Sequence, residues 1–135
     1  MKETCDVKIA EEKKKNAKAR GGKLYDAEGR CLISELEIAD SFFARLKGLL
    51  GRKKIADDYG MFLLPCGSVH MFFMKFEIDV FFLAGDKEVF RILEVKRNLK
   101  PWRVAFAPSG TTAVLETKPG VLENRGQVLK VERNL

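Results

Sequence analysis

The sequence predicts a mainly β (α+β) domain: a compact antiparallel barrel or strongly bent sheet of seven to eight short strands, with one covering helix. Three observations predict this fold. Apolar residues alternate with a period of two after residue 60, Gly and Pro turns separate the short apolar runs, and a single segment has strong helical spacing. Closure into a barrel would also pair the edge strands, which otherwise invite association.

Size and composition fit one globular domain that follows a charged arm. The chain has 135 residues, of which 46% are hydrophobic and 33% charged, and a chain of this length can bury a core without disulfides or metals. Residues 8–20 are highly charged and lack an apolar stripe. We therefore expect a flexible basic N-terminal arm over residues 1–21, ended by Gly21 and Gly22, and a single globular domain over residues 22–135.

Hydropathy and cysteine content favour a cytoplasmic protein without a membrane span. The longest stretch without a charged side chain, residues 60–74, is shorter than the roughly 20 residues that a span needs. The N-terminus lacks the apolar block of a secretory signal. Cys5, Cys31 and Cys66 form no Cys-x-x-Cys pair, which is typical of free thiols in a reducing compartment.

The first part of the domain predicts a hairpin followed by the helix. Residues 24–25 and 31–38 have strand character around a turn in which Gly29 can supply a positive φ. Residues 41–50 place apolar side chains three and four positions apart, and Gly51 follows where a left-handed cap ends many helices.

From residue 60 onward the pattern predicts strands. The run over residues 69–83 is too long for one typical strand, so we expect a bend or bulge near Lys75. The remaining predicted strands are residues 61–64, 87–95, 104–106, 113–117 and 128–132.

The most apolar part of the chain also holds its most reactive side chains. Cys66 and His70 lie four positions apart across a turn, and Asp79 follows. A thiolate nucleophile needs a base within hydrogen-bond reach and often an acid to orient that base, so the residue types suit a thiol enzyme. They equally suit a core histidine and a small buried thiol. A structural zinc site needs four ligands, and Cys5 and Cys31 are distant in sequence, so we expect no metal and no cofactor.

Asp79 either faces solvent by strand alternation or is buried against a cation or backbone donors. Candidate cations are Arg45 on the predicted helix and Arg103, which follows Trp102. Either arginine could instead bind an anionic ligand. Trp102 itself, after Pro101, is interpreted as a loop lid or a core plug.

The ordered succession of motifs resembles the domain of unknown function 192 family over about residues 34–132. It consists of RLKGLLGR at 45–52, the stretch from Cys66 to Leu83, PWR at 101–103, AVLE at 113–116 and Gly120. The resemblance implies a small mainly-β domain found chiefly in prokaryotes, without an established activity. The matching positions are Arg45, Gly48, Cys66, His70, Met74, Asp79, Trp102 and Arg103. The chain departs from the family pattern at Glu77, Ala84 and Gln127.

We expect a binding or accessory module rather than an enzyme, with a pocket for a small molecule or peptide near Cys66, His70 and Asp79. The predicted binding residues are His70, Cys66, Met74, Asp79, Arg45, Trp102 and Arg103. One alternative is a thiol-dependent enzyme with Cys66 as nucleophile and His70 as base. Another is nucleic-acid binding through the basic arm, although the remaining chain carries no recognised nucleic-acid motif.

Overall fold

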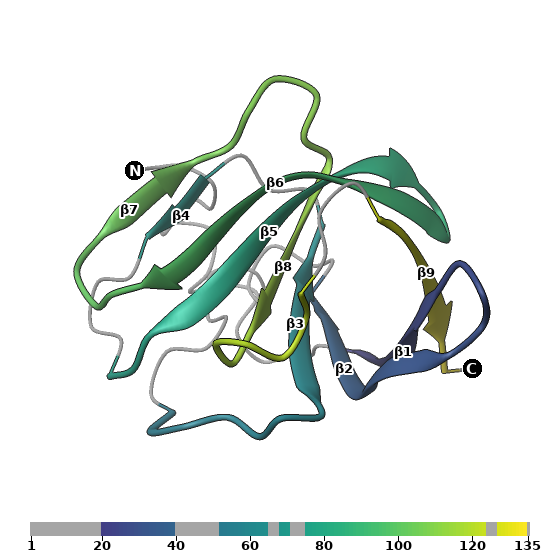
Figure 1. Cartoon of the computed structure of the whole chain (residues 1–135), viewed down its shortest axis with the longest axis horizontal. Coiled ribbons are helices and arrows are strands. Elements are labelled where there is room, and N and C mark those ends of the chain that lie inside the picture. The colour runs from purple at the N-terminus through teal and green to yellow at the C-terminus, as the bar shows by residue number, and fades with distance from the viewer. Residues whose placement is uncertain (1–19, 40–51, 65–67, 71–74, 124–126, 135) are drawn as a thin grey trace, which may run out of the picture.

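The structure is a computed structural model that describes residues 20–39, 52–64, 68–70, 75–123 and 127–134 (Figure 1). These residues form nine strands and contain no helix. The strands are β1 (Arg20–Asp26), β2 (Cys31–Ala39), β3 (Tyr59–Leu63), β4 (Ser68–His70), β5 (Ile78–Asp86), β6 (Val89–Leu99), β7 (Val104–Phe106), β8 (Ala113–Thr117) and β9 (Val128–Arg133).

Seven strands close into a barrel in the order β1-β2-β3-β8-β5-β6-β9, which confirms the predicted mainly β barrel. Every described pair is antiparallel except β2 and β3, which run parallel, so the expectation of a purely antiparallel barrel was wrong at this pair. Parallel neighbours need a crossover of a dozen or more residues, and the chain between these strands, residues 40–58, is long enough. The predicted covering helix at 41–50 lies outside the described residues.

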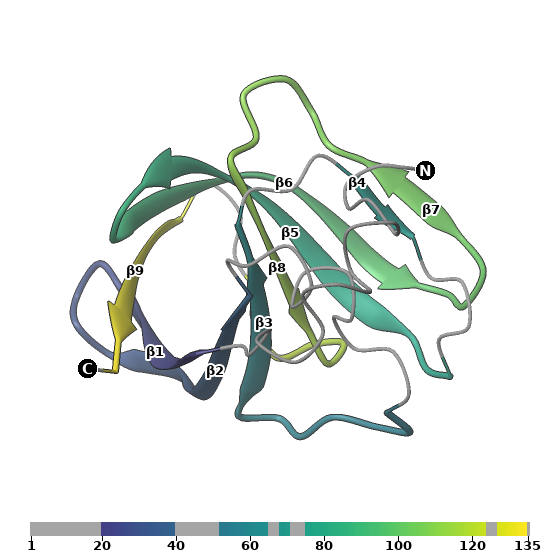
Figure 2. The ribbon, with the colours of Figure 1, turned by 180° about the vertical axis from the view of Figure 1, so that it is seen from behind.

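The strands β4 and β7 pair antiparallel as a separate two-stranded sheet at one side of the barrel (Figure 2). In their register Ser68 is opposite Phe106 and His70 is opposite Val104. The long run predicted at 69–83 is therefore divided between β4 and β5, with the non-strand residues 75–77 where a bend was expected. This arrangement brings the backbone of His70 close to the turn that follows β6.

Strand β1 begins at Arg20, so Gly21 and Gly22 lie inside a strand and not at a break. The reason is a close approach between neighbouring strands. A Cβ atom on Gly22 would lie 2.5 Å from the carbonyl oxygen of Glu132 in β9. Glycine at this position therefore permits pairing of β1 with β9, a role that a sequence pattern does not distinguish from a chain break.

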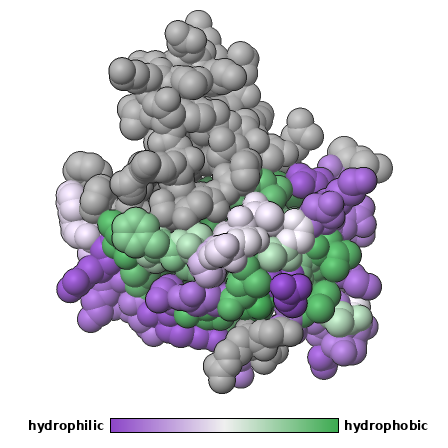
Figure 3. All heavy atoms as spheres, turned by 90° about the horizontal axis from the view of Figure 1, so that it is seen from above, coloured by the Kyte–Doolittle hydropathy of each residue, from purple (hydrophilic) through white to green (hydrophobic). Residues whose placement is uncertain are grey.

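Side chains on the two faces of the barrel wall form two hydrophobic cores. Every barrel strand contributes to the inner core, which includes Phe62 from β3, Phe81 from β5 and Phe90 from β6. Alternation along β5 places Val80 and Phe82 in a second core with residues of β3 and β8. On the face seen in Figure 3, hydrophobic side chains reach the surface between flanks of hydrophilic ones.

We predict that Phe62→Ala lowers the free energy of unfolding by about 3–5 kcal/mol, because it removes a fully buried ring and leaves a cavity. The ring of Phe62 also packs edge-on against Phe90 at 5.0 Å between centroids. The matched control is Phe106→Ala, at a side chain that is 71% exposed, which should change stability by less than about 0.5 kcal/mol. Urea denaturation measures both, and equal effects would contradict the core assignment.

Candidate functional site

The carboxylate of Asp79 is fully buried and accepts three hydrogen bonds, two from β6 and one from the turn after β8. Its Oδ1 atom accepts the backbone N–H of Asn98 at 2.8 Å, and Oδ2 accepts the backbone N–H of Gly120 at 2.9 Å. Oδ2 also accepts a charge-assisted bond from Nη1 of Arg97 at 2.7 Å. A buried charge is stable only with partners of this kind. Asp79 therefore joins β5, β6 and the turn after β8.

A register shift in the β5–β6 ladder brings these partners into place. Ile78 pairs with Leu99 and Val80 pairs with Lys96, so two residues of β6 lie opposite Asp79. Such a bulge re-aims side chains and backbone groups. Asn98 at the bulge has a φ of 51°, in the left-handed region that asparagine tolerates better than most residues.

The hydrogen bonds of Asp79 and Arg97 also fix the turn after β8. Gly120 has a φ of 84°, a conformation that favours glycine. Arg97 donates to the carbonyl oxygen of Leu122 at 2.6 Å as well as to Asp79, and its guanidinium lies 5.4 Å from the ring centre of Phe81. One arginine thus anchors the beginning of the β8–β9 connection to the barrel wall.

Asp79 therefore has the buried and paired environment that was one of its two predicted alternatives. Its cation is Arg97 and neither of the predicted candidates, Arg45 and Arg103. The partner could not be found by spacing alone, because the ion pair depends on the bulge and spans 18 residues. Arg45 lies outside the described residues. Arg103 is exposed, and its backbone N–H donates to the carbonyl oxygen of Lys100 at 3.2 Å.

The structure places part of the remaining predicted site on the β4–β7 sheet. His70 is the last residue of β4 and pairs with Val104, the first residue of β7. Trp102 and Arg103 directly precede Val104 in the sequence. Trp102 is 57% exposed, which excludes the core-plug interpretation. Cys66 and Met74 lie outside the described residues. The convergence of the Cys66 thiol, the His70 imidazole and Asp79, and with it the thiol-enzyme alternative, stays a prediction.

Two hollows open beside the turn that Asp79 holds, and both include Pro119. The first, here called the apolar hollow, has a volume of about 300 Å³. Its lining residues are Lys54, Ile55, Phe76, Glu77, Lys118 and Pro119. The second, called the acidic hollow, has a volume of about 450 Å³. Its lining residues are Leu32, Asp57, Asp58, Pro119, Gly120 and Val121.

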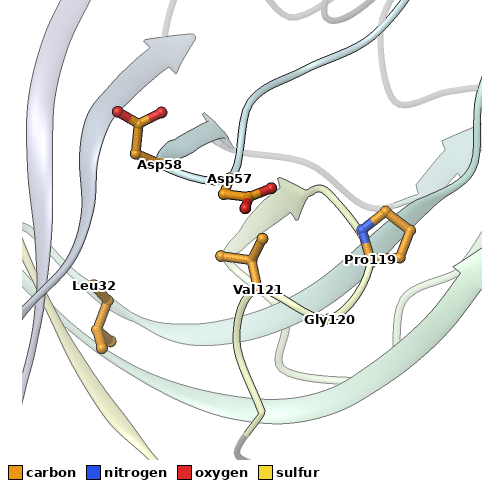
Figure 4. Close-up of a pocket in the computed structure, with 6 residues that line it drawn as sticks. All are labelled: Leu32, Asp57, Asp58, Pro119, Gly120 and Val121. Carbon is orange, nitrogen blue, oxygen red and sulfur yellow. The ribbon is translucent and has the colours of Figure 1, made fainter.

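In the acidic hollow the carboxylates come from the loop before β3. Asp57 lies beside Val121 of the turn after β8, whereas the Asp58 carboxylate points away from that turn (Figure 4). An ion pair of 2.8 Å between Lys118 Nζ and Asp57 joins that loop to the turn. Across the described ranges, no group of three or more His, Cys, Asp or Glu side chains could hold a metal. We therefore assign no ion to the acidic hollow.

A second polar cluster anchors the loop before β3. Glu37 Oε1 accepts hydrogen bonds from the Tyr59 hydroxyl and from Nη2 of Arg52, and the Arg52 guanidinium lies 4.7 Å from the Tyr59 ring centre. Burial raises the pKa of the Tyr59 hydroxyl far above its usual value of 10, and the neighbouring Glu37 carboxylate raises it further. The loop that lines both hollows is thus fixed at each end, at Arg52 and at Tyr59.

Comparison with known proteins identifies the family. The family described as "Uncharacterized ACR", DUF192, matches residues 24–131. The chain belongs to the DUF192 family. This result confirms the resemblance seen in the sequence, and the description of the family assigns it no activity. In the described part of this DUF192 chain, no helix is long and apolar enough to cross a membrane.

Archaeal relatives are named only as UPF0127 proteins. The chain is 35% identical to one from Thermococcus sibiricus over 102 residues, which are 71% of this chain and 62% of that protein. It is 36% identical to one from Pyrococcus horikoshii over 96 residues, which are 67% of this chain and 77% of that protein. The match therefore spans less than two thirds of the Thermococcus sibiricus relative.

Two solved structures share the fold. A proposed transcription regulator from Sinorhizobium meliloti superposes with a TM-score of 0.68 at 23% identity, over 85% of this chain and 95% of that one. A protein of unknown function from Novosphingobium aromaticivorans superposes with a TM-score of 0.65 at 24% identity, over 84% of each chain. At these identities the likeness concerns the fold alone.

We predict that Asp79→Asn lowers the free energy of unfolding by about 2–4 kcal/mol, because the amide nitrogen would face buried donors that the carboxylate now satisfies. Hydrogen exchange should show that the Gly120 amide loses protection. The control is Lys96→Ala, which breaks an exposed ion pair of 2.8 Å with Glu94 and should cost at most about 1 kcal/mol. Unchanged Gly120 protection in Asp79→Asn would contradict the anchoring role.

Alkaline pH tests the Tyr59 cluster. Because the folded-state pKa is raised above the unfolded value near 10, the contribution of Tyr59 to stability is complete below pH 10 and is lost as the pH rises further. We expect Tyr59 to add about 1.4 kcal/mol per pH unit to the decline above pH 10. Tyr59→Phe should remove this part, and Phe106→Ala, which changes an exposed side chain that does not titrate, serves as the control. Identical alkaline slopes in the Tyr59→Phe variant and the unmodified protein would disprove the assignment.

Proposed function

We propose that the protein is a binding module that takes a small molecule or a peptide side chain into the apolar hollow beside Asp79. The observation that carries this proposal is the hollow itself: about 300 Å³, with a mainly apolar lining and charged groups at its margin. Ligand sites in proteins commonly have this size and this combination of surfaces. Ile55 is buried and Phe76 is half-buried, so both can offer apolar contacts to a ligand.

The charged groups at the margin indicate the class of ligand. Lys54 and Lys118 contribute two ammonium groups, of which that of Lys118 also pairs with Asp57 at 2.8 Å, and Glu77 contributes one carboxylate. Glu77 Oε1 accepts a hydrogen bond of 3.0 Å from Nδ2 of Asn98. The Lys54 ammonium favours a ligand that combines an apolar body with an anionic group, such as an aromatic or aliphatic carboxylate.

The frame of the hollow supports binding because both of its sides are anchored. Asp79 holds the turn after β8, which carries Lys118 and Pro119, through the Gly120 amide. The cluster of Glu37 with Arg52 and Tyr59 holds the loop that carries Lys54 and Ile55. A site that is ordered before the ligand arrives loses less conformational entropy on binding.

Three probes of similar size and different charge test the proposal: 3-phenylpropanoate, 3-phenylpropanamide and 3-phenylpropylamine. In ¹H–¹⁵N NMR titrations we expect the carboxylate to bind best and the amine worst. The largest shifts should occur at the amides of Lys54, Ile55, Phe76, Glu77 and Lys118. Phe76→Ala should weaken carboxylate binding by about tenfold, because the variant removes apolar contact area.

The matched control is Phe106→Ala, since Phe106 is not among the residues that line the hollow. This variant should bind the carboxylate as the unmodified chain does. Shifts that spread evenly over the barrel, or equal binding of all three probes, would reject the proposal. So would a Phe76→Ala variant that remains folded and binds without loss.

A further inference from the structure

Trp102 occupies a backbone position that favours glycine. The hydrogen bond from the Arg103 N–H to the Lys100 carbonyl closes a four-residue turn, and Trp102 at its third position has a φ of 70°. Pro101 fixes a negative φ at the second position, so the turn is type II, whose third residue is usually Gly or Asn. A bulky aromatic residue there is strained, and strain of this kind concentrates at functional sites.

Trp102 is also largely exposed to solvent, so burial of its ring offsets little of the backbone strain. A tryptophan in a core would recover folding free energy by burying its large apolar surface. The side chain of Trp102 is 57% exposed and recovers only part of it. Glycine would relieve the backbone strain at this position, whereas tryptophan adds a large and mostly exposed aromatic surface.

An apolar strip continues from this turn into β7. Residues 101–108, PWRVAFAP, include a single charged side chain, Arg103, and Phe106 is 71% exposed. Residues 95–115 contain four cations and no Asp or Glu. Of these cations Arg97 is paired with Asp79, Lys96 is paired with Glu94, and Lys100 and Arg103 flank the tryptophan. We name the segment from Lys100 to Phe106 the aromatic turn.

We propose that the aromatic turn docks on an anionic membrane surface. Tryptophan and phenylalanine favour the interfacial layer of a bilayer, and Lys and Arg beside them are attracted to anionic headgroups. In both ribbon views the β6–β7 turn and β7 lie at the outer margin of the described part of the molecule (Figures 1 and 2). Charge and composition thus match the same partner.

A single-stranded nucleic acid is also anionic and stacks on aromatic rings, but the strip fits it less well. Such a strand needs a row of cations that follows its phosphates. Residues 101–108 offer one cation and otherwise apolar side chains. The aromatic turn shares no residue with the apolar hollow, so this inference is independent of the proposed function.

The test uses intrinsic fluorescence, because Trp102 is the only tryptophan in the chain. The full-length protein is titrated with vesicles of phosphatidylcholine alone and of phosphatidylcholine with phosphatidylglycerol in equal amounts. We expect a blue shift of the emission, and quenching by brominated lipid, only with the anionic vesicles. High salt should weaken the binding, because it screens the headgroup charge.

Variants separate function from folding. Lys100→Glu and Arg103→Glu should each reduce vesicle partitioning, measured by sedimentation, by at least about fivefold for the charge removed. Trp102→Gly should keep or raise the Tm, because glycine accepts the positive φ, while it reduces partitioning. Val89→Ser and Arg91→Glu, at exposed positions near the opposite end of β6, are the controls and should partition normally.

Three results would overturn the inference. One is the absence of a blue shift with anionic vesicles at low salt. Another is a Trp102→Gly variant with a lowered Tm and unchanged partitioning, which would make the ring a packing element. The third is a fluorescence change with single-stranded oligonucleotides and none with vesicles, which would assign the aromatic turn to nucleic acid.

Discussion

The ion pair between Asp79 and Arg97 governs the arrangement of the loops around the barrel. A carboxylate with no exposed surface would strongly oppose folding if it lacked partners, so the chain must bring the Asn98 and Gly120 amides to it together with the arginine. Meeting this demand requires the bulge in β6 and the tight turn after β8. The same demand sets the position of Pro119, which both hollows share. A structural requirement of one acid thereby shapes the surface on which we place ligand binding.

The barrel provides the rigid support for these loops. Residues 78–83 of β5 are buried, because alternate side chains enter the inner core and the second core. A strand packed on both faces cannot shift its register without exposing or clashing many side chains. The polar clusters lie where this wall meets its loops: Asp79 at the start of β5, and Tyr59, which bonds Glu37, at the start of β3. The loops are thus attached to the least deformable part of the fold.

Three left-handed backbone positions lie in the loops discussed above, at Asn98, Trp102 and Gly120. Gly120 and Asn98 adopt a positive φ with residue types that tolerate it, and each presents its amide to Asp79. Trp102 adopts the same region with a residue type that does not favour it, on an exposed turn. The first two conformations satisfy a buried charge. The third places a large aromatic side chain, 57% exposed, on a turn with Lys100 and Arg103, and this exposure and charge are why we attribute it to an external surface.

The sequence by itself determined the β class, most strand positions, the alternation of faces along β5 and the family, because period-two hydropathy and turn residues are local properties of the chain. It also selected Asp79 as an unusual acid. Only the tertiary structure decided that β2 and β3 are parallel, that Gly22 belongs to a strand and that Arg97 is the partner of Asp79. Those features depend on which strands become neighbours and in which register. Contacts across 18 and 41 residues are created by that pairing, and no local pattern encodes them.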